Sequence, residues 1–132
     1  MGSIIALTEA ASIGLHSMVM IARADEMLNV GKISEFIGSS RHHVAKVMQR
    51  LSKEGLVSSN RGPSGGFVLK KEPQEIRLLD IYEAIEGPLE VQSCAMNRDH
   101  CPFGECLMGD LSPKVTKQIK DYLEGRTLQD YL

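Results

Sequence analysis

The alternation of apolar and polar positions along the chain predicts five helices and a short β-hairpin. Apolar residues recur with helical spacing in segments near 8–24, 32–37, 40–54, 78–86 and 112–125. Thr8 can cap the first helix, Ser112 the last, and Thr127 a final turn. Val30 is predicted to form a short strand that pairs with the hairpin. The positions expected to face inward are Ala11, Leu15, Met18, Val19 and Ala22, then Ile33, Phe36 and Ile37, then Leu78, Ile81, Ala84 and Ile85, and finally Val115, Ile119, Tyr122 and Leu123.

The stretch 40–69 changes its pattern twice. A helix begins at Ser40, directly after the turn 38–40 of a helix-turn-helix, and Gly55 can end it. Residues 56–58 then read as a strand, residues 61–66 (RGPSGG) favour a tight turn, and residues 67–69 resume a strand. This is the order of a recognition helix followed by a wing. The sequence therefore predicts a mainly α fold with a small β-hairpin wing.

The positive charge of the chain is concentrated in the same stretch. Residues 41–71 contain seven Lys or Arg and one Glu, whereas the whole chain has 15 basic and 17 acidic residues and a net charge of −2. A basic helix and hairpin in an otherwise acidic protein suggest a polyanionic partner. A solvated helix face beside an edge hairpin protected by lysines is the alternative. The order of helix and wing favours DNA.

Two runs of residues in this stretch carry a family resemblance: Ser40-x-x-His43-Val-x-Lys46 and Leu51-x-x-x-Gly55-Leu-Val-x-Ser59-x-Arg61-Gly-Pro-x-Gly-Gly-Phe67. They resemble the winged-helix motif of the IscR/NsrR superfamily of bacterial transcriptional regulators. The similarity continues through residues 76–87 (IRLLDIYEAIEG) and covers nearly the whole chain. The resemblance implies a winged helix-turn-helix with a long C-terminal dimerisation helix.

The N-terminal residues of the second helix of a helix-turn-helix face base edges. Arg41 is expected to bond guanine or hold a phosphate, and Lys46 and Arg50 to hold phosphates. The resemblance implies that Arg61, at the wing tip, enters a minor groove. His43 has an alternative role, which is to pack the helix against the wing. The DNA-binding candidates are Ser40, Arg41, His42, His43, Lys46, Arg50, Ser59, Arg61 and Ser64.

All three cysteines lie close together in the sequence, at Cys94, Cys101 and Cys106. An odd number of crowded cysteines argues against a disulfide framework and favours a metal, cluster or redox site. Three thiolates suit an iron–sulfur cluster or zinc. A metal-free thiol sensor, whose exposed cysteines oxidise reversibly, is the competing interpretation.

The family resemblance favours the cluster, because many members bind a 2Fe–2S or 4Fe–4S cluster through three cysteines here. The spacing of six and four residues departs from the even spacing usual in the family, so the cluster type stays open. The resemblance places a fourth ligand, the histidine of one relative, at His16. The acidic ligand of other relatives falls at Ser12, which is a poor match. His100 and Asp110 are local alternatives.

We expect three parts: a winged helix-turn-helix DNA-binding domain (1–88), a cysteine loop that binds the cluster or senses the signal (89–110), and a dimerisation helix with a C-terminal turn (111–132). The last helix has an apolar stripe and little domain left to cover it. The resemblance implies a homodimer on a palindromic operator in double-stranded DNA; packing on its own domain is the alternative. A cluster that tethers the loop to the partner's first helix would set the angle between the two DNA-binding domains.

Several classes of protein are not expected. The longest uncharged run, 10–22, is shorter than the about 20 residues that span a bilayer, so the sequence predicts a cytoplasmic protein with no membrane partner. We find no nucleophile–base pair or phosphate-cradling loop, so an enzyme is not expected. An electron-transfer protein would not need the basic helix and wing. The alternatives that stay open are a cluster-free, thiol-based redox regulator and a winged-helix protein-interaction adaptor.

Overall fold

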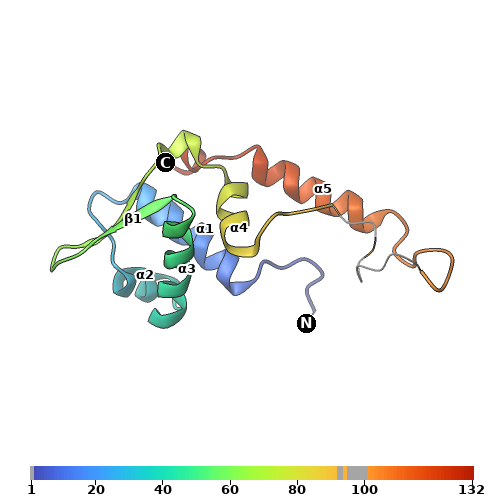
Figure 1. Cartoon of the computed structure of the whole chain (residues 1–132), viewed down its shortest axis with the longest axis horizontal. Coiled ribbons are helices and arrows are strands. Elements are labelled where there is room, and N and C mark those ends of the chain that lie inside the picture. The colour runs from blue at the N-terminus through green and yellow to red at the C-terminus, as the bar shows by residue number, and fades with distance from the viewer. Residues whose placement is uncertain (1, 92–93, 95–100) are drawn as a thin grey trace.

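The computed structural model describes residues 2–91, 94 and 101–132. The elements are α1 (Glu9–Arg23), α2 (Val30–Ile37), α3 (Arg41–Lys53), β1 (Val57–Asn60), β2 (Gly66–Leu69), the 3-10 turn η1 (Pro73–Glu75), α4 (Leu78–Glu86), α5 (Leu111–Glu124) and the 3-10 turn η2 (Leu128–Tyr131). Figure 1 shows a body of α1 to α4 with the hairpin at one end and α5 at the other. The prediction of a mainly α fold with a small wing is confirmed.

Side chains just ahead of three helices explain where these helices begin. Thr8, Asn29 and Ser40 adopt extended conformations, and each side chain accepts a hydrogen bond from the N–H three residues later. Gly38 ends α2 in the left-handed conformation (φ 83°), which a residue with a Cβ rarely adopts. This sharp turn places α3 directly after α2, as in a helix-turn-helix.

Two predicted element boundaries were wrong. Val30 is the first residue of α2 rather than a strand, because the Asn29 side chain caps the helix there. The backbone that pairs with the wing belongs to Leu28, whose carbonyl accepts a hydrogen bond from Phe67 N–H at 2.9 Å. The last helix begins at Leu111, so Ser112 lies inside it and does not cap it.

The buried core is formed mainly by α1, α3 and α4, and Ile33 of α2, Val57 of the hairpin, Leu123 of α5 and Leu128 of η2 complete it. The face of α1 that packs inward carries small residues as well as large ones, namely Ala11, Ile13, Gly14, Ser17, Met18 and Ile21. A Cβ on Gly14 would lie 2.1 Å from Ile85 Cδ1, so the absence of a side chain lets α1 approach α4 closely. Of the residues predicted to face inward, Ala11 and Met18 are buried, whereas Leu15, Val19 and Ala22 are half-buried.

Two aromatic residues expected to face inward are exposed. Phe36 is 77% exposed and Tyr122 is 53% exposed. Ile33 occupies the core position of α2 by itself, since α2 has only eight residues and packs along one narrow side. In α5, Leu123 is the buried residue, while Val115 and Ile119 are half-buried.

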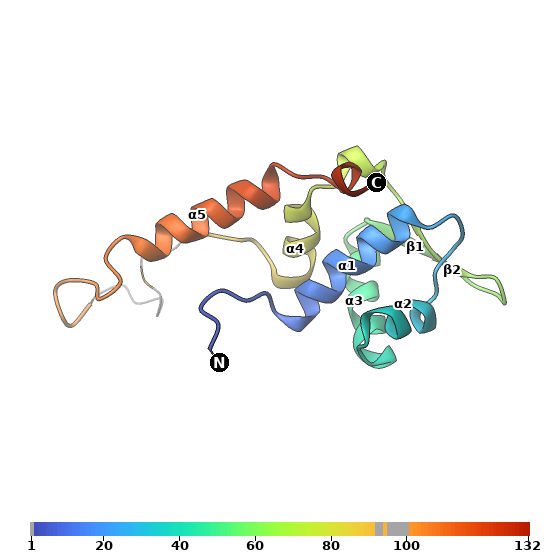
Figure 2. The same cartoon turned by 180° about the vertical axis from the view of Figure 1, so that it is seen from behind.

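Helix α5 is attached to the body mainly at its C-terminal end. Leu123 is buried, and Leu78 N–H donates to the carbonyl of Arg126 at 2.9 Å. From there the helix points away from the body, so its N-terminal end and residues 101–110 lie far from α1 (Figures 1 and 2). This leaves the outer half of α5 and residues 101–110 standing off the body of α1 to α4.

An ion-pair network fixes the C-terminal end of α5 to α4. Arg77 donates to Asp80 (Nη2–Oδ1 2.8 Å) and to Glu124 (Nη1–Oε1 3.2 Å). Asp80 also accepts a hydrogen bond from Arg77 N–H at 2.9 Å. Burial disfavours the charged carboxylate, but the hydrogen bonds from Arg77 outweigh this effect and hold the pKa of Asp80 below its ordinary value.

We expect Asp80→Asn to lower the free energy of unfolding by about 1 kcal/mol at pH 7. The pKa of Asp80 is lower in the folded state than in the unfolded chain, so its contribution is present above the unfolded pKa of about 4 and disappears as the pH falls through the folded pKa. Urea unfolding of both proteins at pH 7 and at pH 3 checks this. Asp121→Asn, which removes half of an exposed helical pair with Lys117, should change stability less. A difference between Asp80→Asn and wild type that does not shrink at low pH would contradict the assignment.

Candidate nucleic-acid interface and cysteine region

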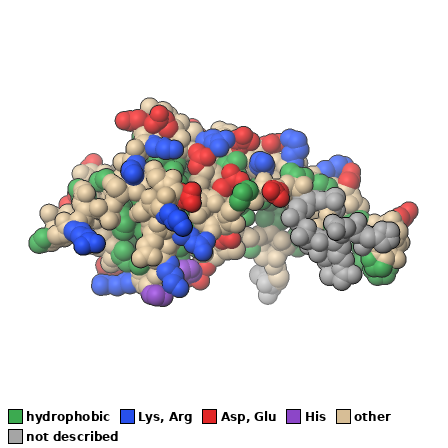
Figure 3. Space-filling model, in the orientation of Figure 1, with side chains coloured by type: hydrophobic (Ala, Val, Ile, Leu, Met, Phe, Trp, Pro, Cys, Tyr) green, Lys and Arg blue, Asp and Glu red, His purple; other side chains and the backbone are tan. Residues whose placement is uncertain are grey.

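The start of α3 presents most of the predicted base-contacting side chains to solvent. Ser40 accepts a hydrogen bond from His43 N–H at 3.1 Å and thereby fixes the first turn of α3. Arg41, His42 and Lys46 are exposed around this turn. Lys, Arg and His side chains gather over α3 and the wing in Figure 3. The start of the recognition helix is thus available to a DNA groove.

His43 lies next to the start of α1. Its predicted contact with DNA and its alternative role of packing α3 against the wing both stay predictions. Its Nδ1 lies 3.4 Å from Glu9 Oε1, on the first turn of α1. Ser39 Oγ donates to the same carboxylate oxygen at 3.3 Å. Glu9 therefore helps to hold the turn between α2 and α3. Sequence reasoning missed this role, because nothing in the local sequence joins two positions 34 residues apart.

The wing is a two-stranded antiparallel ladder of four residue pairs, and its tip is open to solvent. Val57 pairs with Leu69, and Asn60 pairs with Gly66 at the outer end. Arg61 follows the last pair and so lies at the tip, where Arg61 and Ser64 are both exposed. The predicted position of Arg61 at the end of a Gly-rich hairpin is confirmed.

A crevice of about 510 Å³ separates the start of α2, the start of α3 and the wing. Arg41, Ser59 and Arg61 all line it, so the structure brings three of the predicted DNA-binding residues together. Gly31 lines the same crevice, and a Cβ there would lie 3.3 Å from Arg41 Nη2. Arg41 therefore lies against the start of α2. Gly31 carries no side-chain chemistry of its own, so no sequence signal indicated its place beside Arg41.

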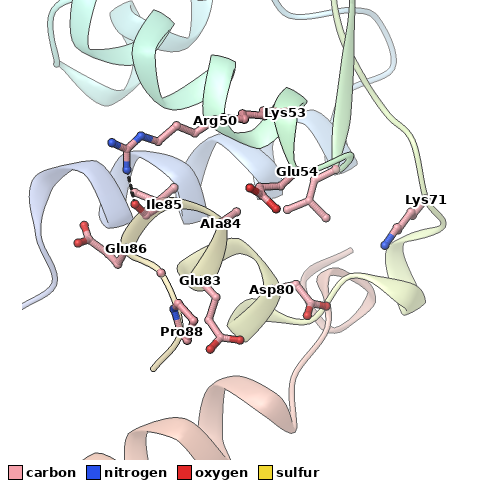
Figure 4. Close-up of a pocket in the computed structure, with 12 residues that line it drawn as sticks. Arg50, Lys53, Glu54, Lys71, Asp80, Glu83, Ala84, Ile85, Glu86 and Pro88 are labelled. Atoms are coloured by element: carbon pink, nitrogen blue, oxygen red, sulfur yellow. Dashed lines mark hydrogen bonds between the residues drawn. The ribbon is translucent and has the colours of Figure 1, made fainter. Parts of the chain in front are cut away.

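Arg50 points away from the start of the recognition helix. Its Nη1 donates to the carbonyl oxygen of Ile85 on α4 at 2.5 Å. Figure 4 shows this hydrogen bond at the edge of a second crevice, between α3 and α4. The phosphate contact expected of Arg50 stays a prediction. The hydrogen bond to Ile85 gives Arg50 a second role, which is to join α3 to the end of α4.

The cysteine region contains two tight turns. Gly104 N–H donates to the carbonyl of Cys101 at 3.3 Å, and Gly109 N–H donates to that of Cys106 at 3.0 Å. The thiol of Cys101 lies 3.7 Å from the carbonyl of Glu105. Cys94 and Cys101 are half-buried, whereas Cys106 is exposed. Cysteine thiolates are ligands of the kind that soft metal centres prefer.

The described residues do not assemble a metal site within one chain. Across residues 2–91, 94 and 101–132, no three His, Cys, Asp or Glu side chains form a group that could hold a metal ion. Asp110, one alternative ligand, forms an exposed ion pair with Lys114 at 2.8 Å. His100, the other, lies outside the described residues.

His16 is exposed on α1 and has a fixed ring orientation. Its Nδ1 lies 2.7 Å from the carbonyl oxygen of Ser12. A carbonyl only accepts, so Nδ1 carries the proton and the lone pair of the neutral ring lies on Nε2. Histidines that bind metals show this arrangement. His16 also lines an apolar groove of about 690 Å³ together with Leu15, Val19, Met20 and Phe36.

Comparison with known proteins gives consistent results. A model of the Rrf2 family, described as iron-dependent transcriptional regulator, matches residues 7–132. An HTH-type transcriptional regulator of Aquifex aeolicus is 33% identical over 111 residues, which cover 82% of this chain and 77% of the relative. The HTH-type transcriptional regulator IscR of Pectobacterium atrosepticum is 31% identical over 126 residues, covering 95% and 73%.

Solved structures agree with these sequence relatives. CymR, the global cysteine regulator of B. subtilis, superposes with a TM-score of 0.77 at 27% identity and covers 96% of this chain and 95% of its own. IscR of T. potens gives a TM-score of 0.74 at 26% identity, with 96% and 85% covered. The neighbours thus include one regulator named for cysteine and one named IscR.

Proposed function

Since the chain belongs to the Rrf2 family of transcriptional regulators, we propose that it binds a palindromic operator as a homodimer and that its cysteine region controls this binding. Proteins of this family are regulators and not enzymes; they bind DNA and act as dimers. The grouping of Arg41, Ser59 and Arg61 around one crevice is the observation that carries DNA binding. We place the protein in the cytoplasm, where bacterial DNA lies. No helix of the described part is long and apolar enough to cross a membrane.

The shape of α5 supports the homodimer. Its outer half stands off the body and carries Leu111, which is 51% exposed, and the half-buried Val115 and Ile119. An apolar stripe of this kind is stabilised when a second copy covers it. A two-fold dimer would set two recognition helices one or more DNA turns apart, as a palindromic operator requires.

The chemistry of the donor set supports an iron–sulfur cluster. Three thiolates and one imidazole are ligands that such clusters accept. The hydrogen bond between His16 Nδ1 and the Ser12 carbonyl leaves the lone pair of Nε2 available to a metal, as a ligand requires. Residues 101–110, which contain Cys101 and Cys106, stand away from α1 of the same copy (Figure 2), so we assign Cys94, Cys101 and Cys106 to one copy and His16 to the other. A bound cluster would supply a link between the two copies that oxidation or nitric oxide can break.

The test is to purify the protein without oxygen and measure its iron, its sulfide and its visible spectrum. We expect iron and sulfide in matching amounts and broad visible absorbance. His16→Ala should lower cluster retention about tenfold or more, since even the loss of a supporting residue lowers metal affinity that much. Asp110→Asn is the matched test of the local alternative and should retain the cluster.

Two outcomes would contradict the cluster proposal. Loss of iron in Asp110→Asn but not in His16→Ala would show that the fourth ligand is local. A colourless protein that still binds DNA would favour the second candidate, a thiol-based redox regulator. The likeness to CymR, the cysteine regulator, and the exposure of Cys106 support that candidate. The oxidation state of the three cysteines, measured by mass spectrometry, would then become the quantity to follow.

A further inference from the structure

The C-terminal end of α4 is where the chain leaves the DNA-binding domain for the cysteine region. In a continued helix the carbonyl of Ile85 would accept from the N–H of Leu89. Leu89 N–H donates instead to Glu83 Oε2 at 2.7 Å, and Arg50 Nη1 donates to the Ile85 carbonyl at 2.5 Å. Arg50, on the recognition helix, thereby satisfies a carbonyl at the negative end of α4.

The same end of α4 is fixed to α1. Thr8, the N-cap residue of α1, donates its hydroxyl hydrogen bond to the carboxylate of Glu86. The side chain of Ile85 is buried and fits against Gly14, where a Cβ would lie 2.1 Å from its Cδ1. Helices α1, α3 and α4 therefore meet within one turn of the point where the chain departs. Figure 4 shows Arg50, Glu83, Ile85 and Glu86 around this junction.

The orientation of Arg50 separates it from the other basic residues of α3. Arg50 lies nine residues after Arg41, which is about 13 Å along the helix axis. Arg41 lines the crevice beside the wing, whereas Arg50 lines a different crevice of about 760 Å³ between α3 and α4. A guanidinium that donates to a helix C-terminal carbonyl is already engaged before DNA arrives.

We propose that Arg50 is a positioning residue that couples the cysteine region to the recognition helix. The proposal rests on the proposed function, since it gives the path by which the cysteine region acts on DNA binding. Residues 87–91 begin the path, and their position is fixed by the hydrogen bond from Leu89 to Glu83. A shift of this segment moves the last turn of α4, and Arg50 transmits the shift to α3. In this proposal the end of α4 takes two positions relative to α3, and the cysteine region determines which of them is occupied.

The first measurement needs no DNA. We expect amide hydrogen exchange across residues 85–89 to become about tenfold faster in Arg50→Gln, because a charged donor to a helix end is removed. Arg50→Lys keeps the charge but not the forked guanidinium and should show a smaller increase; it also serves if Arg50→Gln folds poorly. Unchanged exchange in both variants overturns the proposed link.

The second measurement separates positioning from phosphate binding. Affinity for a random-sequence duplex is measured against salt for wild type, Arg50→Gln and Lys46→Gln. A phosphate contact contributes about 0.9 to the slope of log affinity on log salt, so Lys46→Gln should lose this amount per subunit while Arg50→Gln keeps the wild-type slope. A slope in Arg50→Gln that falls as much as in Lys46→Gln shows a phosphate contact and overturns the proposal.

The third measurement concerns the response of DNA binding to the cysteine region. The response is the ratio of affinities for a selected operator between the protein with intact cysteines and the protein with all three replaced by Ser. We expect this ratio to move toward one in Arg50→Gln. We expect the same in Glu83→Ala, which releases Leu89. Glu83→Gln keeps an acceptor oxygen and should keep the ratio. A full response in Glu83→Ala overturns the coupling alone. A wild-type ratio of one overturns both the coupling and the proposed control of DNA binding by the cysteine region. If wild type binds no duplex, the proposed function fails while the exchange measurement still tests the link.

Discussion

Arg61→Ala should lower the affinity of the protein for its operator by about tenfold to a hundredfold, since loss of one arginine contact to DNA costs about 1–3 kcal/mol. Arg61 follows the last pair of the hairpin, is exposed, and lines the crevice that also contains Arg41 and Ser59. The side chain is therefore free to enter a groove while the start of α3 lies in the neighbouring one. The measurement is fluorescence anisotropy on an operator selected from a random-sequence library, at one fixed salt concentration.

The control for this variant removes a positive charge elsewhere. Lys117 lies on α5, is 68% exposed and pairs with Asp121, so Lys117→Gln should keep the wild-type affinity. Thermal unfolding should be the same for wild type and Arg61→Ala, because an exposed residue at a hairpin tip contributes little to the core. Equal operator binding by Arg61→Ala and wild type would show that Arg61 makes no important contact with DNA.

The parts of the fold that the sequence predicted are those determined by local chemistry. The start of α3 follows from the capping side chain of Ser40 and from apolar residues at helical spacing, both of which lie within one segment. The wing follows from two short apolar runs around a Gly- and Pro-rich turn. The family motif covers the same residues, so the recognition helix and wing were the most predictable region of the chain.

The errors arose where distant segments meet. The strand-like pairing with the wing was placed at Val30, but a single bridging residue, Leu28, gives no periodic signal. The inward face of α1 was predicted correctly at Ala11 and Met18, but the close approach to α4 at Gly14 was missed. Phe36 was expected inside because it is aromatic and helically spaced, yet a helix of eight residues covers only a narrow strip of core.

The residues of the candidate site also divide into those that a local motif defines and those that distant segments orient. The exposed residues at the start of α3 and at the wing tip could be predicted, because each occupies a defined position in a local motif. The partners that orient His43 and Arg50 could not, since Glu9 and Ile85 lie 34 and 35 residues away in the sequence. The ring orientation of His16 could not be predicted either. It depends on a hydrogen bond to the carbonyl of Ser12, and every residue in a helix has such a carbonyl four positions earlier.

Gly66→Ala should weaken operator binding about as much as Arg61→Ala although it removes no charge. A Cβ on Gly66 would lie 2.6 Å from the carbonyl oxygen of Leu28, which is closer than backbone atoms tolerate. The backbone of Leu28 cannot move freely, because its carbonyl accepts from Phe67 N–H and its chain leads directly into the cap of α2. The hairpin must therefore lift off the body, and Arg61 moves with it.

Lifting the hairpin also breaks the bridge between Leu28 and Phe67, so we expect the free energy of unfolding to fall by about 1–3 kcal/mol. Gly2→Ala is the matched control: it makes the same change where an added Cβ meets nothing within 4 Å, and it should alter neither stability nor DNA binding strongly. Urea unfolding and anisotropy on the same samples give both quantities. If Gly66→Ala loses stability but keeps full affinity, DNA binding does not depend on the position of the wing, and Arg61 acts from a flexible tip. If it loses both, the bridge from Leu28 is what holds Arg61 in the position that DNA requires.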